Sequence, residues 1–141
     1  MFKVILVGAD DSLTARRATE AAVQLAVMSS ATLHIVSAYD DSTVSPGDLT
    51  SEFRNVGHSS GGEALLADLS NFAKSKGVVP ILHSVKGSPV DAIVGTADRV
   101  GADLIVVGNK GMKGARRVLG SVPNSVAHGA NCSVTIVDTT E

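Results

Sequence analysis

The sequence predicts one α/β domain over residues 1–141, a doubly wound (Rossmann-like) five-stranded parallel sheet with helices on both faces. Short apolar runs alternate with segments of helical periodicity, which is typical of open sheets with right-handed crossovers. Most of these runs are continuously apolar and rich in Val and Ile, which indicates strands covered on both faces. The apolar fraction of 44% and the charged fraction of 18% argue against a disordered chain.

The expected strands follow one another at wide spacing along the chain. They occupy residues 3–7, 32–38, 78–85, 103–107 and 133–137. Between the second strand and the second helix, residues 40–62 are rich in Ser, Gly and Asp. We expect an irregular surface loop there.

Apolar residues at helical spacing predict four helices between the strands. Their stripes are Ala18, Ala21, Ala22, Leu25 and Met28; Leu65, Leu66, Leu69, Phe72 and Ala73; Val90, Ile93, Val94, Ala97 and Val100; and Val122, Val126 and Ala130. Ser88 precedes Pro89 at the start of the third helix, a cap followed by a proline at the first helical position. Ser12 is the expected cap of the first helix.

The carboxyl ends of the first and fourth expected strands hold the residues with functional potential. Gly8, Ala9 and Asp10 end the first strand, and Gly108 follows the fourth. In open α/β sheets, ligands bind outside the carboxyl ends of strands, where the strand order reverses. If these two strands are neighbours, their loops face each other across one crevice.

The run from Gly108 to Gly120 predicts a phosphate-binding loop. Its glycines, which include Gly111, let the backbone approach an anion closely, and the following helix N-terminus adds N–H groups. No acid lies in this run, and four cations do: Lys110, Lys113, Arg116 and Arg117. The alternative is a connection that uses glycine only to turn. The cations and the Gly120-Ser121 pair favour phosphate binding.

Several enzyme classes lack their motifs in this chain. Neither the GxxxxGK[ST] loop of P-loop nucleoside triphosphatases nor the GxGxxG fingerprint of dinucleotide-binding proteins is present. Asp10 and Asp11 are similar to the acidic pair of a receiver domain. However, residues 85–87 at the end of the third strand offer no aspartate for phosphorylation. No residue is therefore predicted to be catalytic.

The histidines and the cysteine are expected to be structural. The four histidines show no metal-ligand spacing. His34 and His83 lie inside expected strands, where hydrogen bonding is the expected role. Cys132, just before the last strand, is expected to be a small packed residue. No metal ligand is assigned.

Charge and hydropathy restrict the partners. The net charge of −2 does not indicate nucleic-acid binding. No apolar stretch reaches the roughly 18 residues that span a bilayer. The N-terminus lacks the layout of a signal peptide, and one cysteine cannot form an internal disulfide. We therefore expect a cytoplasmic protein without nucleic-acid or membrane partners.

The residues 7–12 and the spacing Gly108-x2-Gly111-x8-Gly120-Ser121 together resemble the universal stress protein family. The likeness covers essentially the whole chain. It implies a homodimer that pairs through the C-terminal strand, and an adenine nucleotide in the crevice. ATP is the expected nucleotide, with Mg²⁺ possible beside it, and AMP or cyclic AMP are the alternatives.

The resemblance also implies roles for the matching positions. Asp10 would meet the adenine or ribose, Ala9 would line the base, Ala38 would pack on it and Val107 would flank it. The expected nucleotide-contacting residues are Gly8, Ala9, Asp10, Ala38, Val107, Gly108, Gly111, Gly120, Ser121 and Val122. The chain departs from the family in one respect, since eight residues separate Gly111 from Gly120 where members often have nine.

The leading functional hypothesis is a dimeric regulatory module that responds to stress by binding an adenine nucleotide. The alternatives are a slow ATPase or autophosphorylating enzyme, a cyclic-AMP-binding protein, and an interaction module that binds no nucleotide. Phosphoryl transfer needs groups preorganised at the γ-phosphate. The sequence shows neither a water-orienting residue nor a dedicated metal site.

Overall fold

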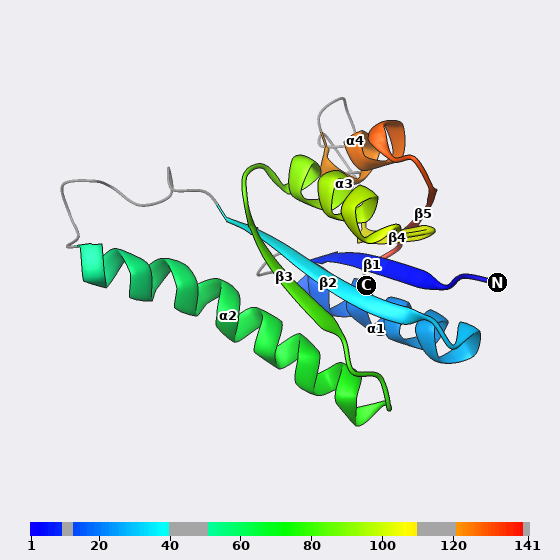
Figure 1. The fold of residues 1–141 in the computed structure, drawn as a ribbon, viewed down its shortest axis with the longest axis horizontal. Helices are drawn as coiled ribbons and strands as arrows, with labels where there is room; N and C mark the ends of the chain where they lie inside the picture. Colours follow the sequence, from blue (N-terminus) through cyan, green and yellow to red (C-terminus); the bar gives the residue numbers. More distant parts are fainter. Residues whose placement is uncertain (10–12, 40–50, 110–120, 140–141) are drawn as a thin grey trace.

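One parallel sheet forms the centre of the chain. The structure is a computed structural model, and it describes residues 1–9, 13–39, 51–109 and 121–139. The strand order is β3-β2-β1-β4-β5, and every neighbouring pair is parallel (Figure 1). The strands are β1 (Val4–Ala9), β2 (Thr32–Tyr39), β3 (Ile81–Lys86), β4 (Leu104–Gly108) and β5 (Ser133–Val137). The helices are α1 (Leu13–Ser29), α2 (Ser51–Ser75), α3 (Pro89–Val100) and α4 (Val122–Gly129).

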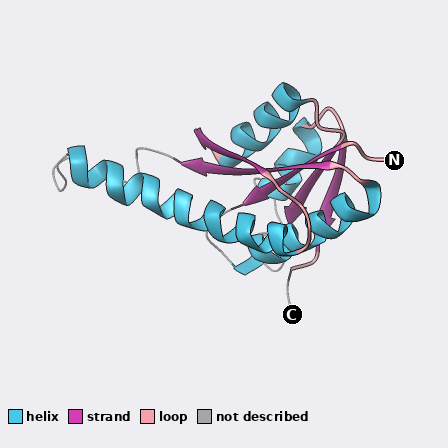
Figure 2. Cartoon of the chain, turned by 60° about the horizontal axis from the view of Figure 1, so that its bottom comes forward, coloured by secondary structure: helices cyan, strands magenta, loops and turns pink. Residues whose placement is uncertain are grey.

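Helices cover both faces of the sheet, which confirms the predicted fold class. α1 and α2 lie on one face, and α3 and α4 lie on the other (Figures 1 and 2). Successive strand residues point to opposite faces, so Ile5 and Val7 pack toward α1 and α2 while Leu6 packs toward α3 and α4. All three are fully buried. This double burial explains why the strands are continuously apolar.

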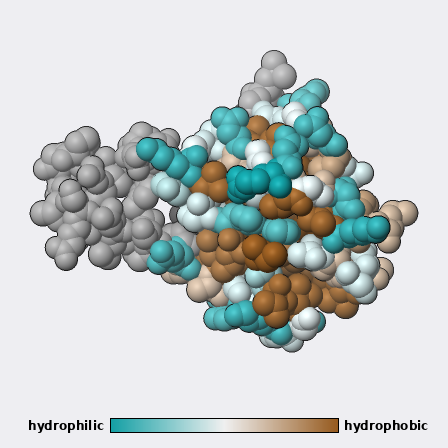
Figure 3. All heavy atoms as spheres, in the orientation of Figure 1, coloured by the Kyte–Doolittle hydropathy of each residue, from teal (hydrophilic) through white to brown (hydrophobic). Residues whose placement is uncertain are grey.

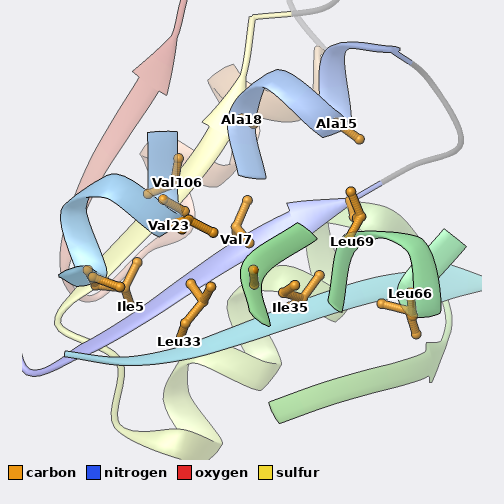
Figure 4. Packing of buried hydrophobic residues seen from close by; sticks show 14 of the residues in the cluster. Ile5, Val7, Ala15, Ala18, Val23, Leu33, Ile35, Leu66, Leu69 and Val106 are labelled. Carbon is orange, nitrogen blue, oxygen red and sulfur yellow. The ribbon is translucent and has the colours of Figure 1, made fainter. Parts of the chain in front are cut away.

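Small residues on α1 face the sheet. The buried positions follow three- and four-residue spacing, at Ala15, Ala18, Ala22, Val23 and Ala26. Figure 4 shows Val23 beside Val7 and Val106, which belong to the same cluster. The expectation that Met28 continues this stripe is wrong. Met28 falls outside the spacing that leads to Ala26, and it is 81% exposed.

Both ends of α3 follow the predicted signals. Ser88 is the N-cap, and its Oγ accepts the N–H of Asp91 at 3.2 Å. Pro89 takes the first turn, where its missing N–H costs nothing. Gly101 ends the helix with φ of 72°, a left-handed conformation that glycine adopts without a Cβ clash. The expected cap Ser12 of α1 lies outside the described residues.

Two predicted boundaries are wrong. Residues 51–62 were expected in a loop but form the first part of α2. The glycines at 57, 61 and 62 suggested a loop because glycine lowers helix propensity. No proline interrupts 51–75, so the sequence holds no strong helix breaker there. β3 begins at Ile81 rather than at residue 78, since Pro80 has no N–H for the ladder.

Asp103 joins the start of β4 to the start of β1. Its carboxylate accepts the N–H groups of Lys3 and Val4 at 2.9 and 3.1 Å. The backbone N–H of Asp103 also donates to the carbonyl of Val4 at 2.9 Å. The hydrogen bond from Lys3 is the main reason that the pKa of Asp103 is lowered. These bonds hold together the two strands that border the expected crevice.

Candidate functional site

The strand order reverses between β1 and β4. From β1 the chain proceeds to β2 and β3 on one side, then crosses to β4 and β5 on the other. Val7 of β1 pairs with Val106 of β4, so Ala9 and Gly108 end the two strands side by side. The first and fourth strands therefore end next to each other at one edge of the sheet. It is the position where open α/β sheets bind ligands.

Gly8 lies at this point because a larger residue would meet α3. A Cβ there would lie 2.6 Å from Ile93 Cδ1 and 3.0 Å from Ile93 Cγ1. It would also lie 3.7 Å from Val107 Cγ1, an ordinary contact. The first distance is shorter than real Cβ contacts and the second is tighter than most, so the Ile93 side chain would have to shift. Close packing of α3 on the sheet therefore explains the glycine.

The structure brings four of the expected site residues to one face of the sheet. Ala38 and Val122 pack against the cluster beneath α3 and α4, Val107 is part of that cluster, and Gly8 opens toward Ile93 of it. Val107 is only 3% exposed, so it lies beneath the surface of this region. Its contact with a bound base stays a prediction.

Two further expected residues are placed differently. Ala9 is buried in the cluster on the α1 and α2 face, opposite Ala38. Gly108 ends β4 beside Val137 of β5 and is partly exposed. Asp10, Gly111 and Gly120 lie outside the described residues, as do the four cations of the glycine-rich run.

Ser121 begins α4 on the same face. Its Oγ accepts the backbone N–H of Asn124 at 3.3 Å, which makes it the N-cap. A capping hydroxyl uses a lone pair, so its proton remains available for donation. The N–H of Val122, at the first helical position, has no acceptor within the helix. Together with the helix dipole, these two donors suit an anion.

A polar clasp of Asn109, Asp138 and Thr139 lies at the carboxyl ends of β4 and β5, and sequence reasoning missed it. The Asn109 side chain donates to Asp138 Oδ1 at 2.9 Å. Its Oδ1 accepts both the N–H and the hydroxyl of Thr139, at 3.0 and 2.9 Å. Asn109 and Thr139 are 6% and 4% exposed. The clasp ties Asn109, the second residue of the glycine-rich run, to the two residues that follow β5.

His34 and His83 are hydrogen-bonded within the sheet, as expected. His34 Nδ1 and His83 Nε2 lie 2.9 Å apart, so the two residues hydrogen-bond to each other. Cys132 is half-buried against the cluster beneath α3 and α4. Burial, followed by the charges of Asp103 and Asp98, raises the pKa of its thiol. A protonated thiol is a weak nucleophile.

No group of three His, Cys, Asp or Glu side chains gathers in the described ranges in a way that would hold a metal ion. No helix in that part of the chain is long and apolar enough to cross a membrane. The described residues near the ends of β1 and β4 thus offer an apolar surface with the N-terminus of α4 on the same face.

Comparisons with known proteins agree with this architecture. A family model described as the universal stress protein family matches residues 1–138. Universal stress protein Rv1636 of Mycobacterium tuberculosis is 37% identical over 144 residues, covering 99% of this chain and 98% of that protein. Universal stress protein YxiE of Bacillus subtilis is 32% identical over 148 residues, covering 97% and 99%.

Solved structures show the same fold. A crystal structure of a universal stress protein in complex with cAMP has a TM-score of 0.81 and 35% identity, covering 99% of both chains. A universal stress protein from Archaeoglobus fulgidus in complex with dAMP has a TM-score of 0.70 and 24% identity, covering 95% of this chain and 96% of that one. The family match over nearly the whole length shows that the chain belongs to the universal stress protein family.

Proposed function

We propose that this protein binds an adenine nucleotide between the carboxyl ends of β1 and β4, and that it acts as a dimeric regulatory module. The observation that carries the proposal is that the strand order reverses between β1 and β4 while Ala38, Gly8 and the start of α4 share one face of the sheet. An apolar surface suits a base, and a helix N-terminus suits phosphate. The relative that is 35% identical was crystallised with cAMP, which supports an adenine nucleotide.

ATP is the nucleotide that we propose first. Four cations in the run from Gly108 to Gly120 exceed what a single phosphate needs, and charge-assisted bonds to a triphosphate would use them. Mg²⁺ would accompany ATP through the phosphate oxygens. The cAMP complex of the 35% identical relative makes cyclic AMP the second candidate. We assign no catalytic residue, and incubation with labelled ATP tests the alternative of a slow ATPase or autophosphorylating enzyme.

A competition titration of ATP, AMP and cyclic AMP at low and high salt tests this choice. We expect ATP to bind most tightly and to lose affinity steeply with salt, because exposed charge pairs are screened. If cyclic AMP binds more tightly than ATP and its affinity depends little on salt, cyclic AMP rather than ATP is the ligand of this site. If none of the three binds, the nucleotide function is wrong and an interaction module remains.

Ser121 and Ser88 form a matched pair for testing the phosphate end. Each is a helix N-cap whose Oγ accepts an N–H three residues ahead, at 3.3 and 3.2 Å. Replacement by alanine is expected to cost about 1 kcal/mol of stability in either case. Only Ser121→Ala removes a donor from the proposed site. We expect it to lower nucleotide affinity by about tenfold, or about 1.4 kcal/mol, while Ser88→Ala binds as the wild type does.

Calorimetric titration measures the affinities of the two variants, and urea unfolding measures their stabilities. Both readings are needed because a frayed α4 would also weaken binding. If the two variants lose the same stability and bind the nucleotide equally well, the Ser121 hydroxyl does not contact the nucleotide.

The dimer is proposed to form through β5. This strand is an edge of the sheet, and Ile136 on it is 37% exposed. Unpaired edge groups favour pairing with a second copy, and a two-fold axis satisfies both edges. We expect light scattering at micromolar concentration to show two copies, and Ile136→Lys to show one. Met28→Lys, an exposed apolar position on α1, should leave two. A wild-type protein that scatters as a single copy would contradict the model.

A further inference from the structure

A pair of titratable side chains lies outside the proposed nucleotide site. His34 of β2 and His83 of β3 are hydrogen-bonded at 2.9 Å, and their rings stack with centroids 5.1 Å apart and planes at 24°. His34 is only 8% exposed. The ladder pairs Val36 with His83, so the rings meet diagonally across the two strands.

The surroundings of the pair offer no compensating acid among the described residues. α3 packs over this face of β2, and its Arg99 adds positive charge near His83. The carboxylate of Asp98 on the same helix instead accepts from Asn131. On β1, the residue opposite His34 is the fully buried Leu6. α1 and α2 lie on the other face of the sheet.

The number of protons on the pair decides whether the bond exists. With no added proton, one ring N–H donates to the lone pair of the other ring. With one added proton, the imidazolium donates to its neutral neighbour. With two, both facing nitrogens carry hydrogen, so the acceptor is lost and two like charges face each other. The doubly charged pair must separate.

We propose that His34 and His83 form an acid-sensitive latch that holds edge strand β3 to the sheet. β3 pairs only with β2, so separation breaks one ladder rather than two. Apolar side chains already reach the surface around this strand (Figure 3), with Ile81 and Leu82 at 47% and 40% exposure. An edge strand such as β3 therefore separates from the sheet at lower cost than a central strand such as β1.

The direction of the pH effect follows from burial. Burial, and then the neighbouring ring, lowers the pKa of His34. Burial, and then Arg99, lowers the pKa of His83. The unfolded chain takes up these protons near pH 6.5, whereas the folded pair takes them up only at lower pH. The latch is thus at full strength above about pH 6.5 and weakens as the pH falls below it.

Separation of β3 from β2 is expected to affect the proposed nucleotide site through the carboxyl end of β3. Gly87, just after β3, donates its N–H to the carbonyl of Tyr39 at 2.8 Å. Val85 pairs with Ala38, which we place near the base. This link rests on the proposed function and predicts weaker nucleotide binding in acid. The latch itself is tested without nucleotide, so its failure and that of the proposed function are distinguishable.

Native-state hydrogen exchange between about pH 7 and about pH 5 tests the latch. Once intrinsic rates are removed, we expect the protection of β3 amides to fall at least about tenfold while that of β1 amides is kept. His83→Gln keeps a hydrogen-bonding group but cannot take the charge, so its β3 protection should depend on pH less steeply than that of the wild type, and burial of His34 accounts for the dependence that remains. His128→Gln, at an exposed position on α4, should behave as the wild type does.

Three results would overturn the proposal. The first is an equal pH dependence of β3 protection in the wild type and His83→Gln. The second is a parallel loss of protection in β1 and β3. The third is read from NMR titration of the wild-type rings, which remains informative if His83→Gln does not fold: independent titration of His34 and His83 near pH 6.5 would exclude a coupled pair. Two successive steps at lower pH support it.

Discussion

Asn109→Asp is expected to destabilise the protein by about 1–3 kcal/mol at neutral pH. The new carboxylate keeps one oxygen for the two Thr139 donors, which now lie at 3.0 and 2.9 Å from Asn109 Oδ1. Its other oxygen replaces the amide that donates to Asp138 Oδ1 at 2.9 Å. Two carboxylate oxygens then face each other with no proton between them. Asn109 is 6% exposed whereas Asp138 lies at the surface, so water screens the repulsion only in part.

The repulsion should depend on pH in a defined direction. A shared proton relieves two facing carboxylates, so one of them takes a raised pKa in the folded variant. The deficit relative to wild type is therefore full at neutral pH and shrinks as the pH falls through the range where that carboxylate is protonated. Urea unfolding of both proteins at one protein concentration measures this difference.

The double variant Asn109→Asp with Asp138→Asn provides the control. The amide now lies on residue 138 and can donate to the carboxylate at 109, which restores the hydrogen bond in reverse. We expect it to be more stable than Asn109→Asp alone, by a coupling energy that a double-mutant cycle measures. If adding Asp138→Asn brings no recovery, the clasp does not operate as the geometry indicates.

The fold class could be predicted because its signal is local. Doubly covered strands must be apolar on both faces, and Ile5, Leu6 and Val7 show this without reference to any other part of the chain. The cap at Ser88 is equally local. The first part of α2 could not be predicted from propensity, since its glycines favour a loop and its helical state is an extension of a packed segment.

The candidate site could be predicted only where a general rule of α/β folds says which parts of the chain lie close together in space. The reversal between β1 and β4 identified Gly8 and Gly108 as neighbours in space. The clasp depends on β4 and β5 lying in register, which brings Asn109 to Thr139 across 30 positions. The His34 and His83 pair likewise needs the β2–β3 register across 49 positions. No spacing in one sequence contains that information.

Gly8→Ala is expected to cost about 1–3 kcal/mol of stability, because the added methyl overpacks the contact between β1 and α3. Its Cβ would lie 2.6 Å from Ile93 Cδ1, on a side chain that is 6% exposed and has little room to turn. Either the Ile93 rotamer or the helix must shift. Since α3 borders the proposed crevice, nucleotide affinity should fall as well.

Ile93→Val identifies the clash, because it removes the Cδ1 methyl. Alone it should cost about 0.5–1.5 kcal/mol through lost packing. Combined with Gly8→Ala, it should cost less than the two single changes added together, since the valine makes the room that the new methyl needs. Gly95→Ala is the control within α3: nothing lies within 4 Å of its added Cβ, so better helix propensity should raise stability by about 0.5–1 kcal/mol. Strict additivity of Gly8→Ala and Ile93→Val in urea unfolding would show that the glycine serves something other than the approach of α3.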